Sequence, residues 1–171
     1  MPSPNPGVVA PSQPPSSATV VYGADHNASW QSEDLRRVLS ELGDVVDVAD
    51  ADPTMNNYVD ISDRVCALTL QHKGTGVIIC GTGIGASIVA NKHRGIYAAR
   101  CLTRSDAIDG KRINNANVLC LSAKTDIHQN LAIAQEFFAT RFVPVEKRMD
   151  RALRIDLVER RNFQSRLDAT V

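Results

Sequence analysis

A glycine-rich turn in the middle of the chain carries the side chain best placed to do chemistry. The sequence Cys80-Gly-Thr-Gly-Ile-Gly puts three glycines into five residues, between an apolar strand pattern at 76–80 and a helical pattern that ends near Lys92. Such a turn exposes backbone N–H groups, which bind phosphate, a carboxylate or a developing enediolate. Nearby N–H dipoles favour a thiolate, so Cys80 is a candidate base or nucleophile.

The same glycines fit the nucleotide-binding motifs poorly. A dinucleotide-binding fold needs GxGxxG after its first strand and an acidic residue about 20 residues later. Here the spacing is GxGxG, and the glycines follow the third strand pattern along the chain. No lysine follows at the spacing of a P-loop. Nucleotide binding is therefore the third of the hypotheses that the sequence leaves open.

Other polar side chains follow the neighbouring strand patterns. Asp25 and His26 end the first strand, and Asn57 and Tyr58 lie in the loop after the second. A histidine beside an acid can donate to a sugar hydroxyl or a phosphate, although a loop histidine that is bonded only locally is equally typical. Tyr58 and Asn57 are candidates to line the same pocket.

These residues need a scaffold, and strand and helix patterns alternate along the chain. The strand patterns lie at 19–24, 45–48, 76–80, 95–99 and 117–121, and the helical patterns at 29–42, 58–72, 84–92, 105–112, 126–140 and 145–166. Strict alternation with short connections predicts an α/β fold, a Rossmann-like five-stranded parallel sheet with helices on both faces. The last pattern predicts a C-terminal helical arm. Ligands of such sheets bind beyond the carboxyl ends of the strands, here at 23–27, 51–58, 80–85 and 100–104.

The first residues differ in composition from the rest. Residues 1–18 hold six of the eight prolines, four serines and no charged side chain. This composition predicts a disordered tail, followed by a single domain at 19–168. The tail has neither the basic and apolar regions of a secretory signal nor the arginines of a transit peptide. The apolar runs are too short to span a bilayer, so no membrane association is expected.

The charge balances in total but not along the chain. The 19 basic and 19 acidic residues argue against a nucleic-acid partner, which would favour a basic protein. Residues 21–63 carry ten acids and two bases, and residues 64–171 carry seventeen bases and nine acids. This split fits an anionic ligand, two faces that meet each other, or scattered solvated charge. The basic final helix either docks on a second subunit or is solvated.

The four cysteines predict free thiols. They form no CxxC pair and have no metal-ligand spacing with the four histidines, so no metal site is expected. Cys66, Cys101 and Cys120 lie in largely apolar sequence, which is typical of buried structural thiols. A reducing, cytoplasmic compartment fits this pattern.

The run Ile79–Lys92, continuing to Gly95-Ile96, resembles the signature of the ribose-5-phosphate isomerase B / galactose-6-phosphate isomerase family. Asp25-His26, Asn57-Tyr58 and the run Asn114–Leu119 resemble its other motifs in the same order. The resemblance covers about residues 19–165. It implies aldose–ketose isomerisation of a phosphorylated sugar, first of all ribose 5-phosphate to ribulose 5-phosphate, through a cis-enediolate and without a metal or organic cofactor.

The resemblance also implies roles for individual residues. Cys80 is the implied base that carries the proton between C1 and C2, and Thr82 assists proton movement between the two oxygens. The amides of Gly81, Gly83 and Gly85 are implied to stabilise the enediolate. The implied substrate contacts are Asp25, His26, Tyr58, Asn114, Lys124, Lys147, Arg148 and Arg151. Members of this family are homodimers whose sites borrow residues from the partner, so a homodimer or a dimer of dimers is expected.

The chain departs from the family pattern at three places. Ile113 stands before Asn114-Asn115, where ribose-5-phosphate isomerases of this family have a histidine that opens the furanose ring. Isoleucine cannot transfer a proton. Asn27-Ala28 and Asn57-Tyr-Val replace the usual Ala-Gly and Asp-Tyr-Pro. A different sugar phosphate, or a sugar-phosphate binder or partner subunit with impaired ring opening, is therefore the alternative to a ribose-5-phosphate isomerase. Cys80 and Thr82 favour an isomerase, because a binder needs no thiol there.

Overall fold

The five strand patterns pair into one parallel sheet. In the computed structural model, which describes residues 18–168, the strand order is β2-β1-β3-β5-β4, and every neighbouring pair is parallel. The strands are β1 (Thr19–Ala24), β2 (Asp44–Asp47), β3 (Thr75–Cys80), β4 (Ala98–Arg100) and β5 (Val118–Ser122). The predicted Rossmann-like α/β sheet is confirmed.

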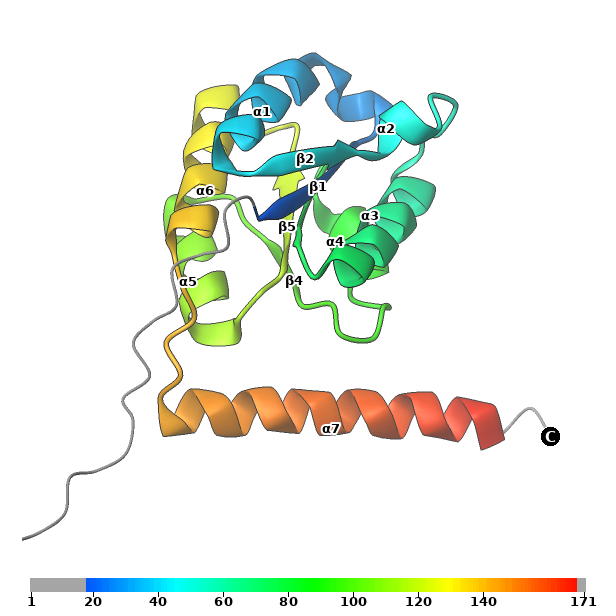
Figure 1. Cartoon of the computed structure of the whole chain (residues 1–171), viewed down its shortest axis with the longest axis vertical. Coiled ribbons are helices and arrows are strands. Elements are labelled where there is room, and N and C mark those ends of the chain that lie inside the picture. The colour runs from blue at the N-terminus through cyan, green and yellow to red at the C-terminus, as the bar shows by residue number, and fades with distance from the viewer. Residues whose placement is uncertain (1–17, 169–171) are drawn as a thin grey trace, which may run out of the picture.

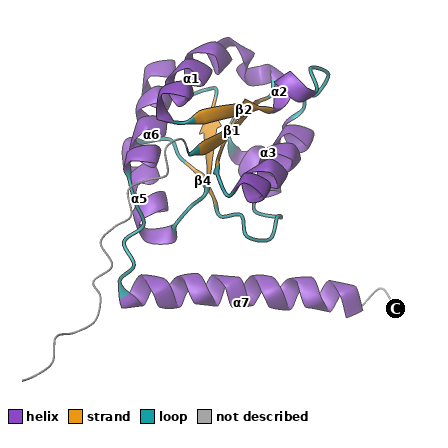
Figure 2. Ribbon diagram, viewed as in Figure 1, coloured by secondary structure: helices purple, strands orange, loops and turns teal. Residues whose placement is uncertain are grey.

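Helices connect the strands and cover both faces of the sheet (Figures 1 and 2). Their bounds are η1 (His26–Ala28), α1 (Ser29–Leu42), α2 (Val48–Ala51), α3 (Tyr58–His72), α4 (Ile84–Ala90), α5 (Arg104–Asn114), α6 (Ile127–Ala139) and α7 (Glu146–Asp168). Helices α1, α5 and α6 pack on one face, and α3 and α4 pack on the other. All crossovers between parallel strands need such connections.

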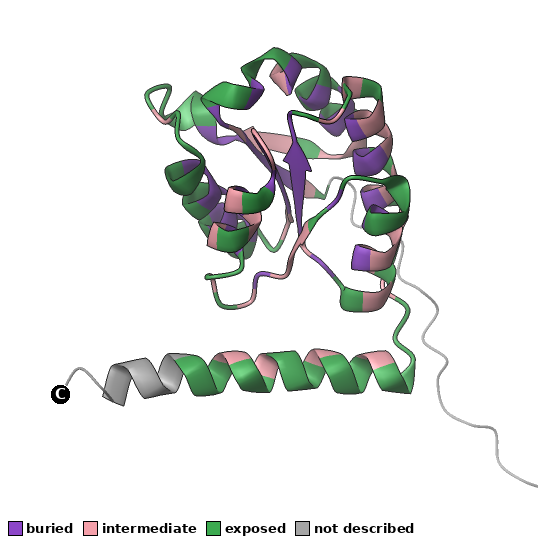
Figure 3. Cartoon of the chain, turned by 180° about the vertical axis from the view of Figure 1, so that it is seen from behind, coloured by how far each residue is buried: buried purple, intermediate pink, exposed green. Residues whose placement is uncertain are grey.

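The strand side chains alternate between two cores. Val77 and Ile79 of β3 join the core beneath α1 and α6, whereas Ile78 and Cys80 join the core beneath α3 and α4. A central strand of a parallel sheet is covered on both faces, which accounts for its uniformly apolar sequence. Figure 3 shows the buried residues gathered on the strands and on the inner sides of the helices. Cys80 therefore faces the α3 and α4 side at the carboxyl end of its strand.

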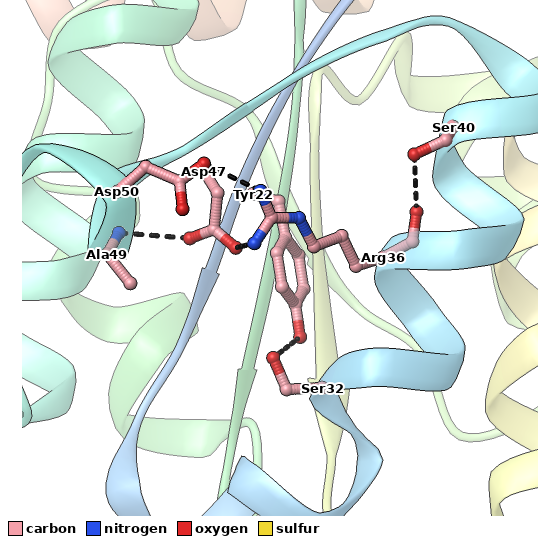
Figure 4. A network of polar contacts seen from close by, with 7 residues as sticks. All are labelled: Tyr22, Ser32, Arg36, Ser40, Asp47, Ala49 and Asp50. Atoms are coloured by element: carbon pink, nitrogen blue, oxygen red, sulfur yellow. Dashed lines mark hydrogen bonds and ion pairs between the residues drawn. The ribbon is translucent and has the colours of Figure 1, made fainter. Parts of the chain in front are cut away.

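A polar network joins β1, α1, β2 and α2 (Figure 4). The Tyr22 hydroxyl donates to Ser32 Oγ at 3.0 Å, and Arg36 pairs with Asp47 at 3.4 Å and with Asp50 at 2.6 Å. The Asp47 carboxylate also accepts the Ala49 N–H at the start of α2. Burial raises the pKa of Asp47, and the Ala49 N–H and Arg36 oppose that shift. The network fixes where the chain leaves β2 toward the loop that carries Tyr58.

The structure differs from the predicted elements in the bounds of one strand and in one additional helix. The fourth strand covers Ala98–Arg100 instead of 95–99, because Gly95 takes a left-handed φ of +81° and the chain turns there before it pairs. The short helix α2 was not predicted. It begins at Val48 because the Asp47 side chain caps it. A helix of four residues is too short to show a helical period of apolar residues in the sequence. Apart from Ala18, the tail predicted to be disordered lies outside the described residues.

Helix α7 lies across the amino ends of the strands, set apart from the sheet and its helices (Figure 1). The Glu159 carboxylate accepts the Gly95 N–H just before β4, and the Val143 N–H donates to the Arg112 carbonyl at the end of α5. The helix is mostly exposed (Figure 3). Within the described residues no helix is long and apolar enough to cross a membrane.

Candidate active site

The end of β3 places Cys80 at the start of the glycine-rich turn. Its side chain is 3% exposed, and its sulfur accepts a hydrogen bond from the Gly83 N–H at 3.2 Å. The other three cysteines are buried as free thiols, as predicted. Burial raises the pKa of Cys66 and of Cys101 to about 12. Cys80 is thus the thiol whose sulfur meets a backbone donor of a turn at the strand edge.

The shape of the turn depends on two glycines. Gly83 has a φ of +71°, and a Cβ at this position would lie 3.0 Å from the Leu121 carbonyl oxygen. A Cβ at Gly85 would lie 2.7 Å from the ring of Tyr58, so that ring rests directly on the turn. Glycine avoids both the left-handed strain and the close contact. Tyr58 starts α3 because the Asn57 side chain caps that helix, and 40% of Tyr58 is exposed.

The side-chain hydroxyl and the carbonyl of Thr82 are both hydrogen-bonded at the turn. Its Oγ1 accepts the Ile84 N–H at 3.2 Å, and its carbonyl accepts Arg100 Nε at 2.8 Å. Because Oγ1 already serves as an acceptor, its own hydrogen can be donated to another oxygen. Arg100 was not among the predicted site residues. Its place at the carboxyl end of a strand had put segment 100–104 among the predicted ligand-facing loops, but no role was predicted for Arg100 itself.

The loop after β1 lies beside this turn. The Asp25 N–H donates to the Ile79 carbonyl, and the Asp25 carboxylate, 2% exposed, accepts the backbone and side-chain N–H groups of Asn27. Asn27 in turn borders Gly81, where a Cβ would lie 3.6 Å from the Asn27 Cβ. Asp25 therefore shapes the loop that meets the turn.

His26 has a defined orientation. Both its backbone N–H and its ring Nδ1 lie within hydrogen-bond distance of the Asn56 carbonyl, at 3.1 and 2.9 Å. A carbonyl oxygen only accepts, so Nδ1 carries a proton, and in the neutral ring Nε2 is the acceptor. The exposed ring of His26 thus presents an acceptor nitrogen beyond the strand edge.

The segment after β5 reaches the same turn. The Ala123 N–H donates to the Cys80 carbonyl at 2.9 Å, and Ser122 Oγ donates to the Gly81 carbonyl at 3.2 Å. Ser122 Oγ also accepts the Lys124 N–H. The strand order makes β1, β3 and β5 neighbours, so their carboxyl ends bring Asp25, Cys80 and Lys124 to one edge.

Four predicted contacts lie at the opposite edge of this chain. Asn114 ends α5 just before β5 begins, at the amino ends of the strands. Lys147, Arg148 and Arg151 belong to α7, which lies at the same amino edge. The six residues of β3 separate that edge from Cys80 by roughly 16 Å, at about 3.3 Å per residue. One chain alone does not bring these four residues to the glycine-rich turn.

Metal chemistry has no visible ligand set in the described part of the chain. Among the side chains of residues 18–162, no group of three or more His, Cys, Asp and Glu lies close enough together to hold a metal ion. What the carboxyl edge does hold is a thiol, a hydroxyl, an imidazole and a turn rich in backbone N–H groups. Such a set is suited to moving protons beside a developing oxyanion.

The sequence model of the Ribose/Galactose Isomerase family matches residues 20–155. The chain belongs to this family. The resemblance drawn from the Cys80–Lys92 motif is confirmed, and the chain is also similar to named sugar-phosphate isomerases and to solved structures of type B ribose 5-phosphate isomerases.

Three similar proteins show the range of the family. The D-erythrulose-4-phosphate isomerase of Pectobacterium atrosepticum is 36% identical over 114 residues, covering 62% of this chain and 72% of that protein. The DNA damage-repair/toleration protein DRT102 of Arabidopsis thaliana is 33% identical over 128 residues, which is 72% of this chain but only 40% of DRT102. The type B ribose 5-phosphate isomerase of Leishmania infantum has 28% identity and a TM-score of 0.79, covering 85% of this chain and 99% of that one.

Proposed function

We propose that this protein is an aldose–ketose isomerase of a phosphorylated sugar, with ribose 5-phosphate and ribulose 5-phosphate as its first expected substrate pair. The observation that carries the proposal is the Cys80 sulfur at the Gly83 N–H, inside a turn whose other N–H groups can receive an oxyanion. Membership of the Ribose/Galactose Isomerase family supports the reaction class. The name of the Leishmania relative supports the pentose phosphate.

In the proposed reaction Cys80, as a thiolate, removes the proton from C2 of the open-chain aldose. The C–H electron pair becomes the C1–C2 double bond, and the carbonyl pair moves onto O1, which gives the cis-enediolate. The Thr82 hydroxyl passes a proton from O2 to O1. The Cys80 thiol then returns its proton to C1 while O2 becomes the ketone oxygen. The amides of Gly81 and Gly85 stabilise the charge on the two oxygens, and the Gly83 amide stabilises the Cys80 thiolate.

The remaining residues of the carboxyl edge are proposed to bind the substrate. Asp25 shapes the loop beside Gly81, and His26 offers Nε2 to a hydroxyl. Tyr58 bounds the site from the side of α3. Lys124 is proposed to meet the phosphate, since a cation beside the turn suits a dianion.

We propose that the site is completed by a second copy of this chain, in a homodimer or a dimer of dimers. Asn114, Lys147, Arg148 and Arg151 lie at the wrong edge to reach Cys80 of their own chain. Helix α7 and the residue before it also expose an apolar stripe of side chains at every fourth position, each 48–59% exposed, namely Val145, Met149, Leu153 and Leu157. A second copy would bury this stripe and place the basic residues of one chain at the turn of the other.

Ile113 favours a second candidate substrate, a tetrose phosphate. In D-erythrulose 4-phosphate and its aldose the phosphate occupies O4, so no furanose ring can form and no ring-opening residue is needed. The Pectobacterium relative is named for that substrate. An isomerase without a proton donor at position 113 is chemically complete for such a sugar.

Because isoleucine cannot transfer a proton, Ile113 also leaves open the alternative that the chain is a sugar-phosphate binder or partner subunit with impaired ring opening. Cys80 and Thr82 weigh against it, because binding alone requires no base. Free thiols at all four cysteines support a cytoplasmic enzyme. With ribose 5-phosphate as its first expected substrate, the enzyme is proposed to act in the pentose phosphate pathway.

A coupled assay across tetrose, pentose and hexose phosphates tests these proposals. Turnover of ribose 5-phosphate is the expected result, and preference for the tetrose by kcat/KM would assign the second substrate. Saturable binding of sugar phosphates with no turnover of any would replace the isomerase by the binder. Neither binding nor turnover would remove both.

A further inference from the structure

Two amide side chains form a fully buried pair between helices on the α1 and α6 side of the sheet. Gln31 of α1 and Asn130 of α6 are both 0% exposed, and Asn130 Nδ2 donates to Gln31 Oε1 at 2.7 Å. They are 99 residues apart in sequence. Helices α1 and α6 lie side by side and are in contact (Figure 1). Their neighbours in this layer, such as Leu35 and Ile133, are apolar core residues.

The pair donates to three carbonyls of one short segment, Ser122–Thr125. Asn130 Nδ2 lies 2.9 Å from the Ser122 carbonyl, and Gln31 Nε2 lies 3.1 Å from that of Ala123 and 2.9 Å from that of Thr125. We call Gln31 and Asn130 the amide clamp. The clamp holds the carbonyl side of the turn that contains Lys124.

The other side of the same segment touches the candidate active site. The Ala123 N–H bonds the Cys80 carbonyl, and Ser122 Oγ bonds both the Gly81 carbonyl and the Lys124 N–H. Only the backbone of Ser122–Thr125 therefore lies between the clamp and the glycine-rich turn. The clamp and the glycine-rich turn thus hold the backbone around Lys124 from two sides.

The clamp stabilises buried backbone carbonyls, but it leaves one polar atom of its own unpaired. Burying an amide costs free energy unless its groups are hydrogen-bonded, and removing the Gln31 amide would leave the Ala123 and Thr125 carbonyls without this donor. Asn130 Oδ1 is buried and has no hydrogen-bond partner within the described part of the chain. An unpaired acceptor in an apolar layer is a cost, whereas the donors of the same amide all go to the segment and to Gln31.

We propose that Gln31 and Asn130 are positioning residues that hold Ser122–Thr125 so that Lys124 meets the phosphate of the substrate. This inference rests on the proposed function, because Lys124 is taken as a phosphate contact. The clamp touches no substrate. It acts through the backbone of the segment, and its loss changes phosphate affinity before it changes proton transfer.

The test is a double-mutant cycle between the clamp and Lys124. Gln31→Met with Asn130→Leu removes every clamp donor and keeps the volume, and Lys124→Ala removes the cation. The clamp variant is expected to raise KM about tenfold, to raise the dissociation constant of inorganic phosphate by the same factor, and to change kcat less than about threefold. Lys124→Ala is expected to weaken phosphate about tenfold in the intact protein and much less in the clamp variant.

If the clamp had only a structural role, its loss would leave the dissociation constant of phosphate unchanged. Thr69→Val is the matched control, because Thr69 is a buried polar residue at the far end of α3 whose hydroxyl has no partner among the side chains and backbone that the structure describes. It is expected to leave KM and phosphate binding unchanged. Gln31→Met alone, which leaves Asn130 in place, is the milder second variant in case the double variant does not fold.

The outcomes separate the two proposals. Independent, multiplicative effects of the clamp and Lys124 on phosphate binding, or an unchanged phosphate dissociation constant in the clamp variants, would overturn the clamp and leave the isomerase standing. A wild-type protein that binds phosphate but converts no sugar phosphate would overturn the isomerase, and the cycle would still be read from phosphate binding. A wild-type protein that does neither overturns both.

Discussion

Among single residues, Cys80 is set apart by the backbone around its sulfur. Cys66, Cys101 and Cys120 are enclosed by apolar side chains, and burial raises the pKa of all three thiols. The Cys80 sulfur instead receives the N–H of Gly83 at the mouth of a turn. The four thiols are therefore not expected to have the same reactivity, although all four cysteines are less than a tenth exposed.

Replacing Cys80 by Ser or Ala is expected to lower kcat/KM by about a thousandfold or more, because the proposed base is removed. The fold is expected to persist, since either side chain fits the space of the thiol. Steady-state kinetics and a thermal melt of the same preparations measure both. Cys101→Ala, a buried thiol on the other face of the sheet, is the control that keeps activity. Full activity of Cys80→Ala would exclude Cys80 as the base.

A second residue-scale prediction concerns Asp47. Its folded-state pKa is raised by burial, so ionising it costs more in the folded chain than in the unfolded chain. The stability linked to this group is complete below its unfolded pKa of about 4 and is lost as the pH rises through the folded pKa.

Asp47→Asn keeps the side-chain oxygen that caps α2 and removes the buried charge. The variant is expected to be at least as stable as the natural protein near pH 7 and to lose that advantage as the pH falls to about 4. Urea midpoints measured across this range give the comparison. Asp50→Asn, at an exposed partner of Arg36, is the control with little change. An Asp47→Asn variant that is less stable at neutral pH and recovers in acid would contradict the sign.

At the scale of elements, the turn between β3 and α4 depends on one left-handed glycine. Gly83→Ala is expected to destabilise the fold by about 1–2 kcal/mol or more, because a Cβ is strained at positive φ and would press on the Leu121 carbonyl. Chemical denaturation measures the loss. Gly81→Ala is the matched variant, since a Cβ there meets only ordinary contacts, the nearest at 3.6 Å. Equal destabilisation by both would show that the backbone angle is not what matters.

For the whole molecule, the decisive question is whether each site is built from two chains. Cys80→Ala and Arg151→Ala are both impaired, the first in proton transfer and the second in phosphate contact, with a KM about tenfold higher. In a mixed dimer, one of the two sites pairs an intact Cys80 with an intact Arg151 of the other chain. An equal mixture that has exchanged subunits is expected to regain about a quarter of the natural activity at low substrate.

The control is the same mixture before exchange, which keeps only the sum of its two parts. Sedimentation measures the oligomer directly. A mixture whose activity never exceeds that sum would place Arg151 and Cys80 in separate functions or in one chain.

The sequence by itself determined the alternation of strands and helices, the buried central strand and the chemistry of the Cys80 turn. These are local properties: a period of apolar residues, a capping side chain or a run of glycines acts over a few residues. The family membership followed from the same turn. Even so, Gln31 and Asn130 carried no local signal, because a polar residue inside a helical pattern looks the same whether it is solvated or buried.

Only the tertiary structure decided which loops meet. The order β2-β1-β3-β5-β4 makes three strand ends neighbours across about a hundred residues of sequence, and pairing over such distances is set by packing rather than by local pattern. The same packing sends α7 and its basic residues to the amino edge, away from Cys80. The fold thus brings the turn, the thiol and Lys124 to one edge of the sheet, and it places Lys147, Arg148 and Arg151 at the opposite edge of the same chain.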